Sequence, residues 1–296
     1  RLQLAANAIG VARLWYAQLR LHVACAVDDP CEAARQHAQE NPDAGQQEHR
    51  CERELDRMRN VDDFDSIHGA APCAFQCTIV VARRLPRGGV HALAVDCATG
   101  NGQAAIALAG HFDAVLAVDC SLVQLERALP HPKVRYELAM AEHLPVPDQS
   151  VSLVAAAQAV HWFDFERFHV ECRRVLRPGG VIAVWTYEKF QAGAAIDSIV
   201  DRFYTDVVGD CWPPERRYVE EAYQTLPFPW AEERVPDFQL VTEWSLEQAI
   251  GYCASWSAVQ RFKDERPGED PLPALAGQLA TLWPAAGTLR LKWPIH

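Results

Sequence analysis

The sequence predicts an α/β protein with a doubly wound, mostly parallel sheet of the seven-stranded type and an irregular or helical N-terminal appendage. Two patterns support this. From residue 90 onward, short apolar runs alternate with helical segments, a rhythm that builds parallel sheets covered by helices on both faces. The first apolar run ends on Asp96, a turn with Gly100 and Gly102 follows, and the next apolar run ends on Asp119. Strand, glycine turn, helix and a strand ending on an acid form a nucleotide-binding unit.

The expected elements follow in chain order from the apolar patterns. We expect strands near residues 91–96, 114–119, 133–138, 151–157 and 180–187, and helices near 102–110, 121–129 and 164–176. Pro178, Gly179 and Gly180 end the last of these helices before an apolar, β-branched run. Further helices are predicted over 192–225, with a break at Trp212–Pro214, and over 245–258 and 272–282, before a closing strand at Leu289–Trp293.

The chain divides into two parts by composition. Residues 1–89 form an atypical segment, whose first acid is Asp28, and residues 31–60 are polar without a clear apolar stripe. A solvated helix or disorder is expected there. Leu85–Gly89 then marks a linker. We therefore place one domain at 90–296, and we expect residues 1–89 to be an atypical segment that is either partly disordered or not native to the family of that domain.

Composition limits the classes of partner. A net charge of −11 over 296 residues argues against nucleic acid, because a phosphate-binding surface needs an excess of Lys and Arg. No apolar run approaches the ~20 residues of a membrane span, so a cytoplasmic protein that acts on a small molecule is expected. Among ten cysteines, Cys73 and Cys77 have no matching second pair, and no metal site is expected.

The turn after the first apolar run has the composition of a cofactor loop. Glycines at 100 and 102 let the backbone turn tightly and approach a ligand. Their spacing also fits the dinucleotide fingerprint, with Asp119 at about the expected distance of ~20 residues. Asp96 favours S-adenosylmethionine instead, because a carboxylate at that strand end can receive an ammonium group while Asp119 accepts hydrogen bonds from both ribose hydroxyls.

Four blocks of sequence carry a family resemblance. They run from Val95 to Gln103, from Val118 to Ser121, from Ala141 to Pro145 with Asp148 to Ser150, and from Gln158 to Gly180. On these blocks residues 90–296 resemble the class I S-adenosylmethionine-dependent methyltransferases, in the group that includes ubiquinone-pathway and trans-aconitate methyltransferases. The last block is the most specific, since it joins a His-Trp turn, a helix and an Arg-Pro-Gly-Gly stop.

The resemblance implies a Rossmann-like sheet with a cofactor site along the strand ends. Asp96 and the backbone around Gly100 would hold the methionine part, Asp119 the ribose, and Ala141 with Glu142 the adenine. The full set of expected cofactor-binding residues is Asp96, Ala98, Gly100, Gly102, Asp119, Ser121, Ala141, Glu142 and Gln158. Ala98 stands where the family's commonest motif has its first glycine. Alanine is small enough for this change to be tolerated.

His161 is the candidate acid or base of the last block, because the ordinary pKa of histidine suits proton transfer near neutrality. The alternative is a packing role beside Trp162. Trp162, Trp185 and Tyr187 are candidates to line the acceptor site, although aromatic residues in such numbers more often belong to the core.

Arg216 and Arg217 are adjacent, so on a helix they point about 100° apart and one of them is expected to face the site. An arginine there could hold a carboxylate with two parallel hydrogen bonds. In the alternative, both arginines pair with Glu215, Glu220 or Glu221 on a solvated helix.

The predicted reaction moves the methyl group of S-adenosylmethionine to a small-molecule acceptor, with a carboxylic acid favoured. Its sulfonium is already activated, so the protein mainly positions the reactants and excludes water. Two alternatives are kept. A non-catalytic cofactor-binding protein is one, and an NAD(P)-dependent oxidoreductase is the other. The second is disfavoured because no tyrosine is followed by lysine four residues later.

Overall fold

The computed structural model describes residues 92–230, 237–285 and 287–296, all of which belong to the same compact unit. The predicted boundary between residues 89 and 90, and everything expected of residues 1–89, including Cys73 and Cys77, lie outside the described residues. Within the described part, no helix is long and apolar enough to cross a membrane.

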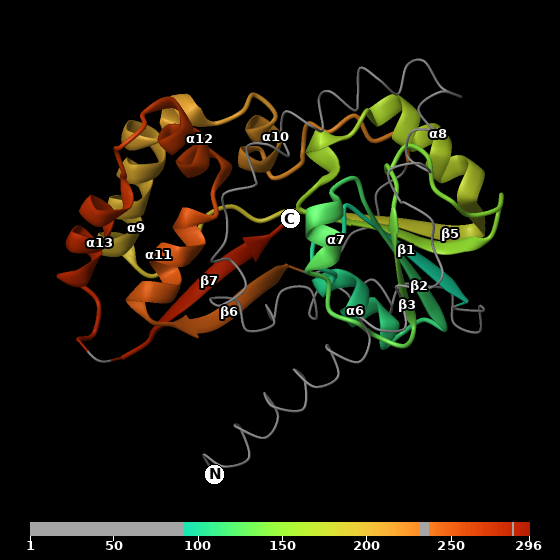
Figure 1. Ribbon diagram of the computed structural model, residues 1–296, viewed down its shortest axis with the longest axis horizontal. Helices are drawn as coiled ribbons and strands as arrows, with labels where there is room; N and C mark the ends of the chain where they lie inside the picture. The colour runs from blue at the N-terminus through green and yellow to red at the C-terminus, as the bar shows by residue number, and fades with distance from the viewer. Residues whose placement is uncertain (1–91, 231–236, 286) are drawn as a thin grey trace, which may run out of the picture. The chain divides into compact units, whose positions relative to one another are not determined.

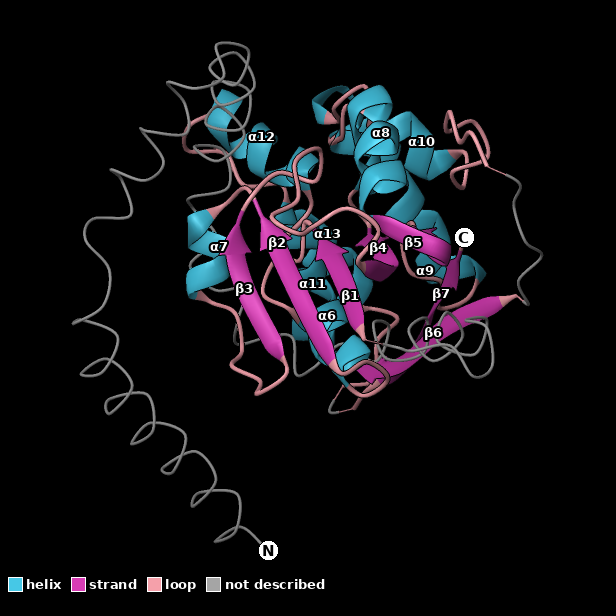
Figure 2. Ribbon diagram, turned by 90° about the vertical axis from the view of Figure 1, so that its right-hand side faces the viewer, coloured by secondary structure: helices cyan, strands magenta, loops and turns pink. Residues whose placement is uncertain are grey.

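A five-stranded parallel sheet is the centre of the described fold. Its strands are β1 (Leu93–Cys97), β2 (Ala114–Asp119), β3 (Val134–Leu138), β4 (Val151–Ala157) and β5 (Leu176–Trp185), in the order β3-β2-β1-β4-β5. Figure 2 shows β3, β2 and β1 side by side with their carboxyl ends at one edge. Strand β2 lies on one side of β1 and β4 lies on the other, so the direction of strand order reverses at β1. Ligand-binding loops are expected at such a reversal. The predicted doubly wound, mostly parallel sheet is confirmed.

The two faces of the sheet carry alternate residues of each strand. Ala94, Ala117 and Ala155 face the cluster that includes helix α6 (Gln103–Ala109). Their neighbours along the strands face the cluster that includes helix α8 (Phe165–Val175); these are Val95, Leu116, Val118, Val154 and Ala156. Because both faces of the sheet are covered, its buried parallel strands are continuous apolar runs in the sequence. These runs made the strands predictable.

Capping side chains begin two of the helices that follow strands. Ser121 caps α7 (Leu122–Glu126) by accepting a hydrogen bond from the Gln124 amide at 3.4 Å. Asp164 caps α8 by accepting from the Arg167 amide at 3.1 Å. A short 3₁₀ turn, η1 (Val160–Trp162), lies between β4 and α8. The helices predicted near 102–110, 121–129 and 164–176 are confirmed, with α7 shorter than expected.

The segment after β5 forms several short helical pieces within the broken helical stretch predicted over 192–225. These are α9 (Ala194–Arg202), a π-helical turn η2 (Phe203–Val207), a 3₁₀ turn η3 (Gly209–Cys211) and α10 (Arg216–Glu220). The predicted break at Trp212–Pro214 is confirmed. Two consecutive prolines there lack the N–H groups that a continuous helix needs.

The remaining chain contains a strand that the sequence analysis missed. This strand, β6 (Phe238–Trp244), pairs antiparallel with β7 (Leu289–Ile295) from Phe238↔Ile295 to Trp244↔Leu289. Between them lie α11 (Leu246–Ala254), α12 (Ser257–Glu265) and α13 (Leu272–Ala280). The helix predicted over 245–258 is therefore two helices, and Ser245 with Gln248 forms a capping box at the first.

The β6–β7 pair adjoins the central sheet beside the chain that leaves β5. Tyr187 bridges Ile295 and Gln191 bridges Lys292, while Thr186 and His296 exchange backbone hydrogen bonds of 2.8 and 3.0 Å. The seven strands of the described part are thus arranged as five plus two. Figure 1 shows α9, α11, α12 and α13 gathered beside this strand pair.

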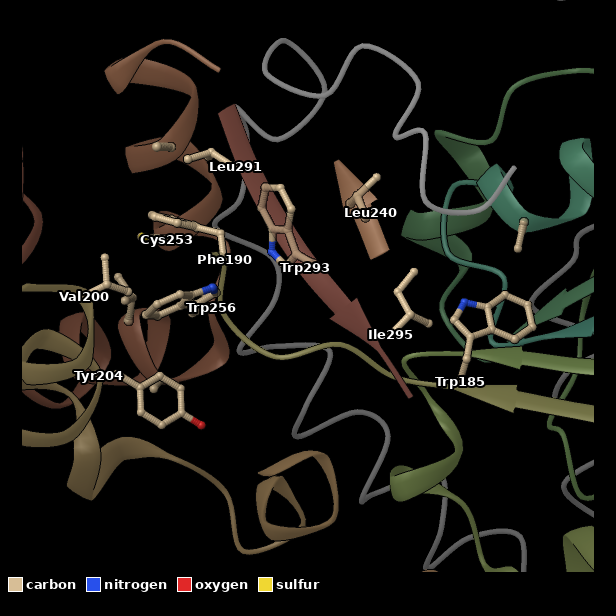
Figure 3. Packing of buried hydrophobic residues seen from close by; sticks show 14 of the residues in the cluster. Trp185, Phe190, Val200, Tyr204, Leu240, Cys253, Trp256, Leu291, Trp293 and Ile295 are labelled. Carbon is tan, nitrogen blue, oxygen red and sulfur yellow. The ribbon is translucent and has the colours of Figure 1, made fainter. Parts of the chain in front are cut away.

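Strands β6 and β7 and the helices α9, α11, α12 and α13 form what we call the second region. Aromatic side chains fill its core. Trp293 of β7 lies within 6 Å, centroid to centroid, of Phe190, Trp244 and Tyr252. Figure 3 shows Trp293 and Ile295 along β7, with Trp256 and Tyr204 on the helical side and Trp185 at the end of β5. Burial of such large rings is a main stabilising term, and it holds the helices beyond β5 against the sheet.

Candidate functional site

The turn after β1 contains three left-handed residues within five positions. Ala98, Gly100 and Gly102 have φ angles of 53°, 57° and 88°. The turn is closed by hydrogen bonds from the Thr99 amide to the Val118 carbonyl and from the Gly102 amide to the Thr99 carbonyl. Glycine adopts this backbone freely, whereas alanine at position 98 costs about 1–2 kcal/mol.

The two glycines of the turn have different surroundings. A Cβ on Gly102 would lie 2.1 Å from the hydroxyl oxygen of Tyr136, whereas a Cβ on Gly100 would meet nothing closer than the Gln124 Oε1 at 4.0 Å. Gly102 is therefore required for packing against Tyr136, a residue that sequence reasoning missed. Gly100 keeps one side of the turn open for a ligand.

Asp96 is a buried carboxylate at the end of β1. The Thr99 hydroxyl donates to its Oδ2 at 2.5 Å, while its Oδ1 is fully buried and has no hydrogen-bond partner among the described residues. Burial raises the pKa of Asp96 to about 7, although the Thr99 hydroxyl and the nearby Ala105 amide, which makes no hydrogen bond of ordinary geometry to Oδ1, oppose the shift. A buried acceptor atom without a partner is costly, and an ammonium group would satisfy it.

Asp119 ties the end of β2 to the turn after β1. Its Oδ2 accepts from the Gly100 amide and its Oδ1 from the Ser121 amide, both at 2.8 Å. Burial raises the pKa of Asp119, and the amides of Gly100, Ser121 and Cys120 work against this shift. Two ionised oxygens offer about four acceptor positions, so capacity remains for hydroxyl groups of a ligand.

The turn after β3 carries Ala141 and Glu142. Ala141 is buried in the core face that contains α8. Glu142 accepts a hydrogen bond from the Asp164 amide through its Oε1 at 2.8 Å, and burial raises its pKa. Glu142 therefore links the turn after β3 to the start of α8.

Gln158 joins the end of β4 to the end of β5. Its Nε2 donates to the Tyr187 carbonyl at 2.8 Å, and its Oε1 accepts from the Tyr187 amide at 3.0 Å and the Thr186 hydroxyl at 2.6 Å. Its φ of 56° is unusual for a residue other than glycine. The side-chain amide of Gln158 therefore forms its hydrogen bonds within the protein and fixes the ends of β4 and β5 relative to each other.

His161, in η1, is buried and paired. Its Nδ1 lies 2.7 Å from the hydroxyl oxygen of Tyr223, and its ring lies 4.9 Å from that of Trp162. Burial, together with the charge of Arg216, lowers the pKa of His161 to about 3. The ring is therefore neutral near pH 7 and a weaker base than an ordinary histidine, which favours the packing role that was the alternative from the sequence.

Tyr223 is a site residue that sequence reasoning missed. It follows α10, lies 62 positions from His161 in the chain, and is buried. Both Ala222 and Tyr223 have left-handed backbones, with φ of 53° and 60°, at about 1–2 kcal/mol for each residue. Nothing in the local sequence distinguishes this tyrosine, because only the folded chain brings it to η1.

The remaining aromatic candidates divide between core and site. Trp185 is 5% exposed and belongs to the core of the second region. Tyr187 is half-buried, with its backbone held by Gln158. Trp162 is half-buried against His161. Of the three, Trp162 lies directly beside the His161–Tyr223 pair.

The two adjacent arginines point in different directions. Arg216 lies over the ring of Trp212, with Cζ 4.6 Å from the centroid, and its Nε donates to the Tyr204 hydroxyl at 2.8 Å. That hydroxyl donates to Glu220 at 2.6 Å. Arg217, fully exposed, donates to the neighbouring Tyr218 hydroxyl. Only the first arginine is turned inward, as the 100° geometry requires.

The charge of Arg216 acts on the rings around it. It adds to the burial that lowers the pKa of His161, and it opposes the burial that raises the pKa values of Tyr223 and Tyr252. Arg216 therefore lies in the same neighbourhood as the His161–Tyr223 pair, on the side of the aromatic residues. A cation, a neutral imidazole and aromatic rings could together receive an anionic, partly apolar molecule.

The chain is similar to proteins that are described as methyltransferases. Residues 95–184 match a family model described as a methyltransferase domain. A solved structure described as a type II methyltransferase from Anaeromyxobacter dehalogenans is 40% identical, covers 74% of this chain and 92% of its own, and has a TM-score of 0.68.

Two curated relatives match over shorter stretches. A Dictyostelium discoideum protein described as a methyltransferase is 34% identical over 173 residues, 57% of this chain and 66% of the relative. The malonyl-[acyl-carrier protein] O-methyltransferase of Dechloromonas aromatica is 39% identical over 95 residues, 32% of this chain and 35% of the relative. The chain thus spans just under two thirds of one curated relative and about a third of the other.

Proposed function

Since the chain belongs to the class I S-adenosylmethionine-dependent methyltransferases, we propose that it transfers the methyl group of this cofactor to a small-molecule acceptor. The observation that carries the proposal is the carboxylate of Asp96. Its Oδ1 is buried, has no hydrogen-bond partner in the described part of the chain, and lies beside a glycine turn that is open at Gly100. An amino-acid ammonium group fits that atom, whereas a nicotinamide dinucleotide offers no such cation there.

The remaining cofactor contacts follow from the same edge of the sheet. Asp119 would accept the ribose hydroxyls with the acceptor positions that Gly100 and Ser121 leave free. Ala141 and Glu142 would line the adenine, and Gln158 would keep the ends of β4 and β5 in place. When bound, S-adenosylmethionine supplies a methyl group on a positively charged sulfur, so these residues need only bind, orient and exclude water.

We further propose a carboxylic acid as the acceptor, held by Arg216. The Nε of this residue donates to Tyr204 and its Cζ lies over the ring of Trp212, and its two terminal nitrogens would bind a carboxylate. A carboxylate is ionised near pH 7 and needs no general base, which agrees with the lowered pKa of His161. The O-methyltransferase among the relatives also supports an oxygen acceptor. The cytoplasmic location stays a prediction.

The test has two stages. Calorimetry with S-adenosylmethionine and with NADH separates the proposed cofactor from the oxidoreductase alternative, and only the first is expected to bind. Turnover of labelled cofactor over a panel of carboxylic acids, phenols and amines then identifies the acceptor. Methyl esters are the expected products. Binding of S-adenosylmethionine without turnover on any class would favour the non-catalytic alternative.

A further inference from the structure

His161 and Tyr223 form a buried pair whose bonding leaves one ring nitrogen unused. The Nδ1 of His161 lies 2.7 Å from the Tyr223 hydroxyl oxygen, and the two residues are 5% and 9% exposed. The imidazole of His161 makes no other hydrogen bond within the described ranges. Its Nε2 is therefore available to a ligand at the carboxyl end of β4.

The direction of the hydrogen bond decides what Nε2 can do. A neutral imidazole has one N–H and one bare nitrogen, and burial with the charge of Arg216 keeps His161 neutral. The 2.7 Å separation is typical of a hydroxyl donor and shorter than the usual ~2.9–3.0 Å of an N–H donor to oxygen. This distance favours donation to Nδ1 by the Tyr223 hydroxyl, which burial keeps protonated. The ring proton then resides on Nε2.

The backbone at Tyr223 indicates that this side chain is kept for its contacts. Ala222 and Tyr223 are consecutive left-handed residues, a conformation that glycine or asparagine adopts more easily. Such strain persists where the surroundings fix it, and it concentrates at functional sites. What the tyrosine side chain adds here is burial against η1 and a hydroxyl directed at His161.

We propose that Tyr223 is a positioning residue that holds His161 in the Nε2–H tautomer, so that the imidazole donates a hydrogen bond to the methyl acceptor's oxygen and removes no proton from it. The proposal rests on the proposed methyl transfer. In that step a carboxylate oxygen forms the new bond to carbon as the carbon–sulfur bond breaks, and no proton moves. A neutral donor orients the carboxylate while drawing less electron density from it than an imidazolium would.

The tautomer can be read directly by NMR on the full chain labelled with ¹⁵N-histidine. We expect a protonated Nε2 and a bare Nδ1 for His161 between pH 5.5 and 8, with the signal assigned by its loss in His161→Gln. Tyr223→Phe removes only the hydroxyl and should shift the His161 signals. Tyr218→Phe is the matched control, since that hydroxyl contacts exposed Arg217. A protonated Nδ1 in the unmodified protein would overturn the proposal even if Tyr223→Phe does not fold.

Kinetics test the acceptor role. Tyr223→Phe should raise KM for the best acid about tenfold, the effect of one lost hydrogen bond, with little change in kcat and none in the affinity for S-adenosylmethionine. An unchanged KM would show that Tyr223 does not position His161 for the acceptor. If the unmodified protein binds no S-adenosylmethionine, the proposed function fails and the acceptor role fails with it. The NMR result would still report the tautomer separately.

Discussion

The backbone amide of Gly100 donates to the carboxylate of Asp119 at 2.8 Å. This hydrogen bond joins the turn after β1 to the end of β2, so the two parts of the proposed cofactor site are held as one unit. A change at Asp119 is therefore expected to affect the methionine side of the site as well as the ribose side.

Asp119→Ala should weaken S-adenosylmethionine binding by about 2–4 kcal/mol, because two ribose hydroxyls lose a charged acceptor and the Gly100 amide loses its partner. Titration calorimetry on the folded variant measures the loss. Asp113→Ala, an equivalent change at an exposed position just before β2, serves as the control. Full affinity in Asp119→Ala would remove Asp119 from the site.

Asp96 should make cofactor binding depend on pH. Its pKa of about 7 means that the carboxyl is largely protonated at pH 6, and the ammonium group needs the ionised form. Affinity should rise with pH and level off above about pH 7, with proton release on binding below that value. Calorimetry in buffers of different ionisation enthalpy measures the released proton. The Asp96→Asn variant should bind S-adenosylmethionine about 2 kcal/mol more weakly than the unmodified protein at pH 8. Its affinity should show no pH dependence from position 96.

The same carboxylate should lower the stability of the ligand-free protein as pH rises. The folded chain keeps a proton on Asp96 that the unfolded chain has released between about pH 4 and 7, so the free energy of unfolding falls through that window. Asp96→Asn removes this loss. Its melting temperature relative to the unmodified protein should be higher at pH 8 than at pH 5. Equal differences at the two pH values would contradict the burial of an ionisable group at position 96.

Arg216 and Arg217 provide a matched pair of substitutions. Arg216→Ala should raise KM for an acidic acceptor about tenfold to a hundredfold, because a carboxylate loses a charged partner, whereas Arg217→Ala should leave KM unchanged. Arg216→Lys keeps the charge without the planar pair of donors and should be intermediate. Equal KM values for all three variants would exclude a carboxylate grip by Arg216.

Ala98→Gly should stabilise the protein by about 0.5–1 kcal/mol. The left-handed backbone penalty of alanine disappears, and the greater freedom of glycine in the unfolded chain offsets part of the gain. Urea unfolding measures the difference. Ala104→Gly, inside helix α6, is the control and should destabilise by about 1 kcal/mol. A destabilised Ala98→Gly would show that the methyl group of Ala98 contributes packing that outweighs the strain.

Local patterns explain how much of this molecule is predictable. The turn after β1 and the acids at 96 and 119 are read from short stretches, because strand, turn and helix signals lie next to one another there. β6 was missed because Phe238–Trp244 mixes apolar and polar residues and is stabilised by pairing with β7. The distance in sequence between His161 and Tyr223 hides their contact for the same reason, since only tertiary structure brings them together.

The adjacent arginines show the boundary between the two kinds of inference. Helical geometry predicts that only one of Arg216 and Arg217 faces inward. It cannot choose between them, because the choice depends on Trp212 and Tyr204, which receive the Arg216 guanidinium. Gln158 is a similar case, because the sequence does not reveal that its side-chain amide forms hydrogen bonds with the backbone of Tyr187.

The close approach of Tyr136 to Gly102 makes the sizes of these two residues interdependent. A methyl group at position 102 cannot coexist with the phenol ring where it lies, so Gly102→Ala alone should be severely destabilising. Combined with Tyr136→Ala, which vacates that volume, part of the loss should be recovered, and the two effects should be strongly non-additive. The inner dimension of the turn is thus set by a side chain from β3, two strands along the sheet from where the turn begins.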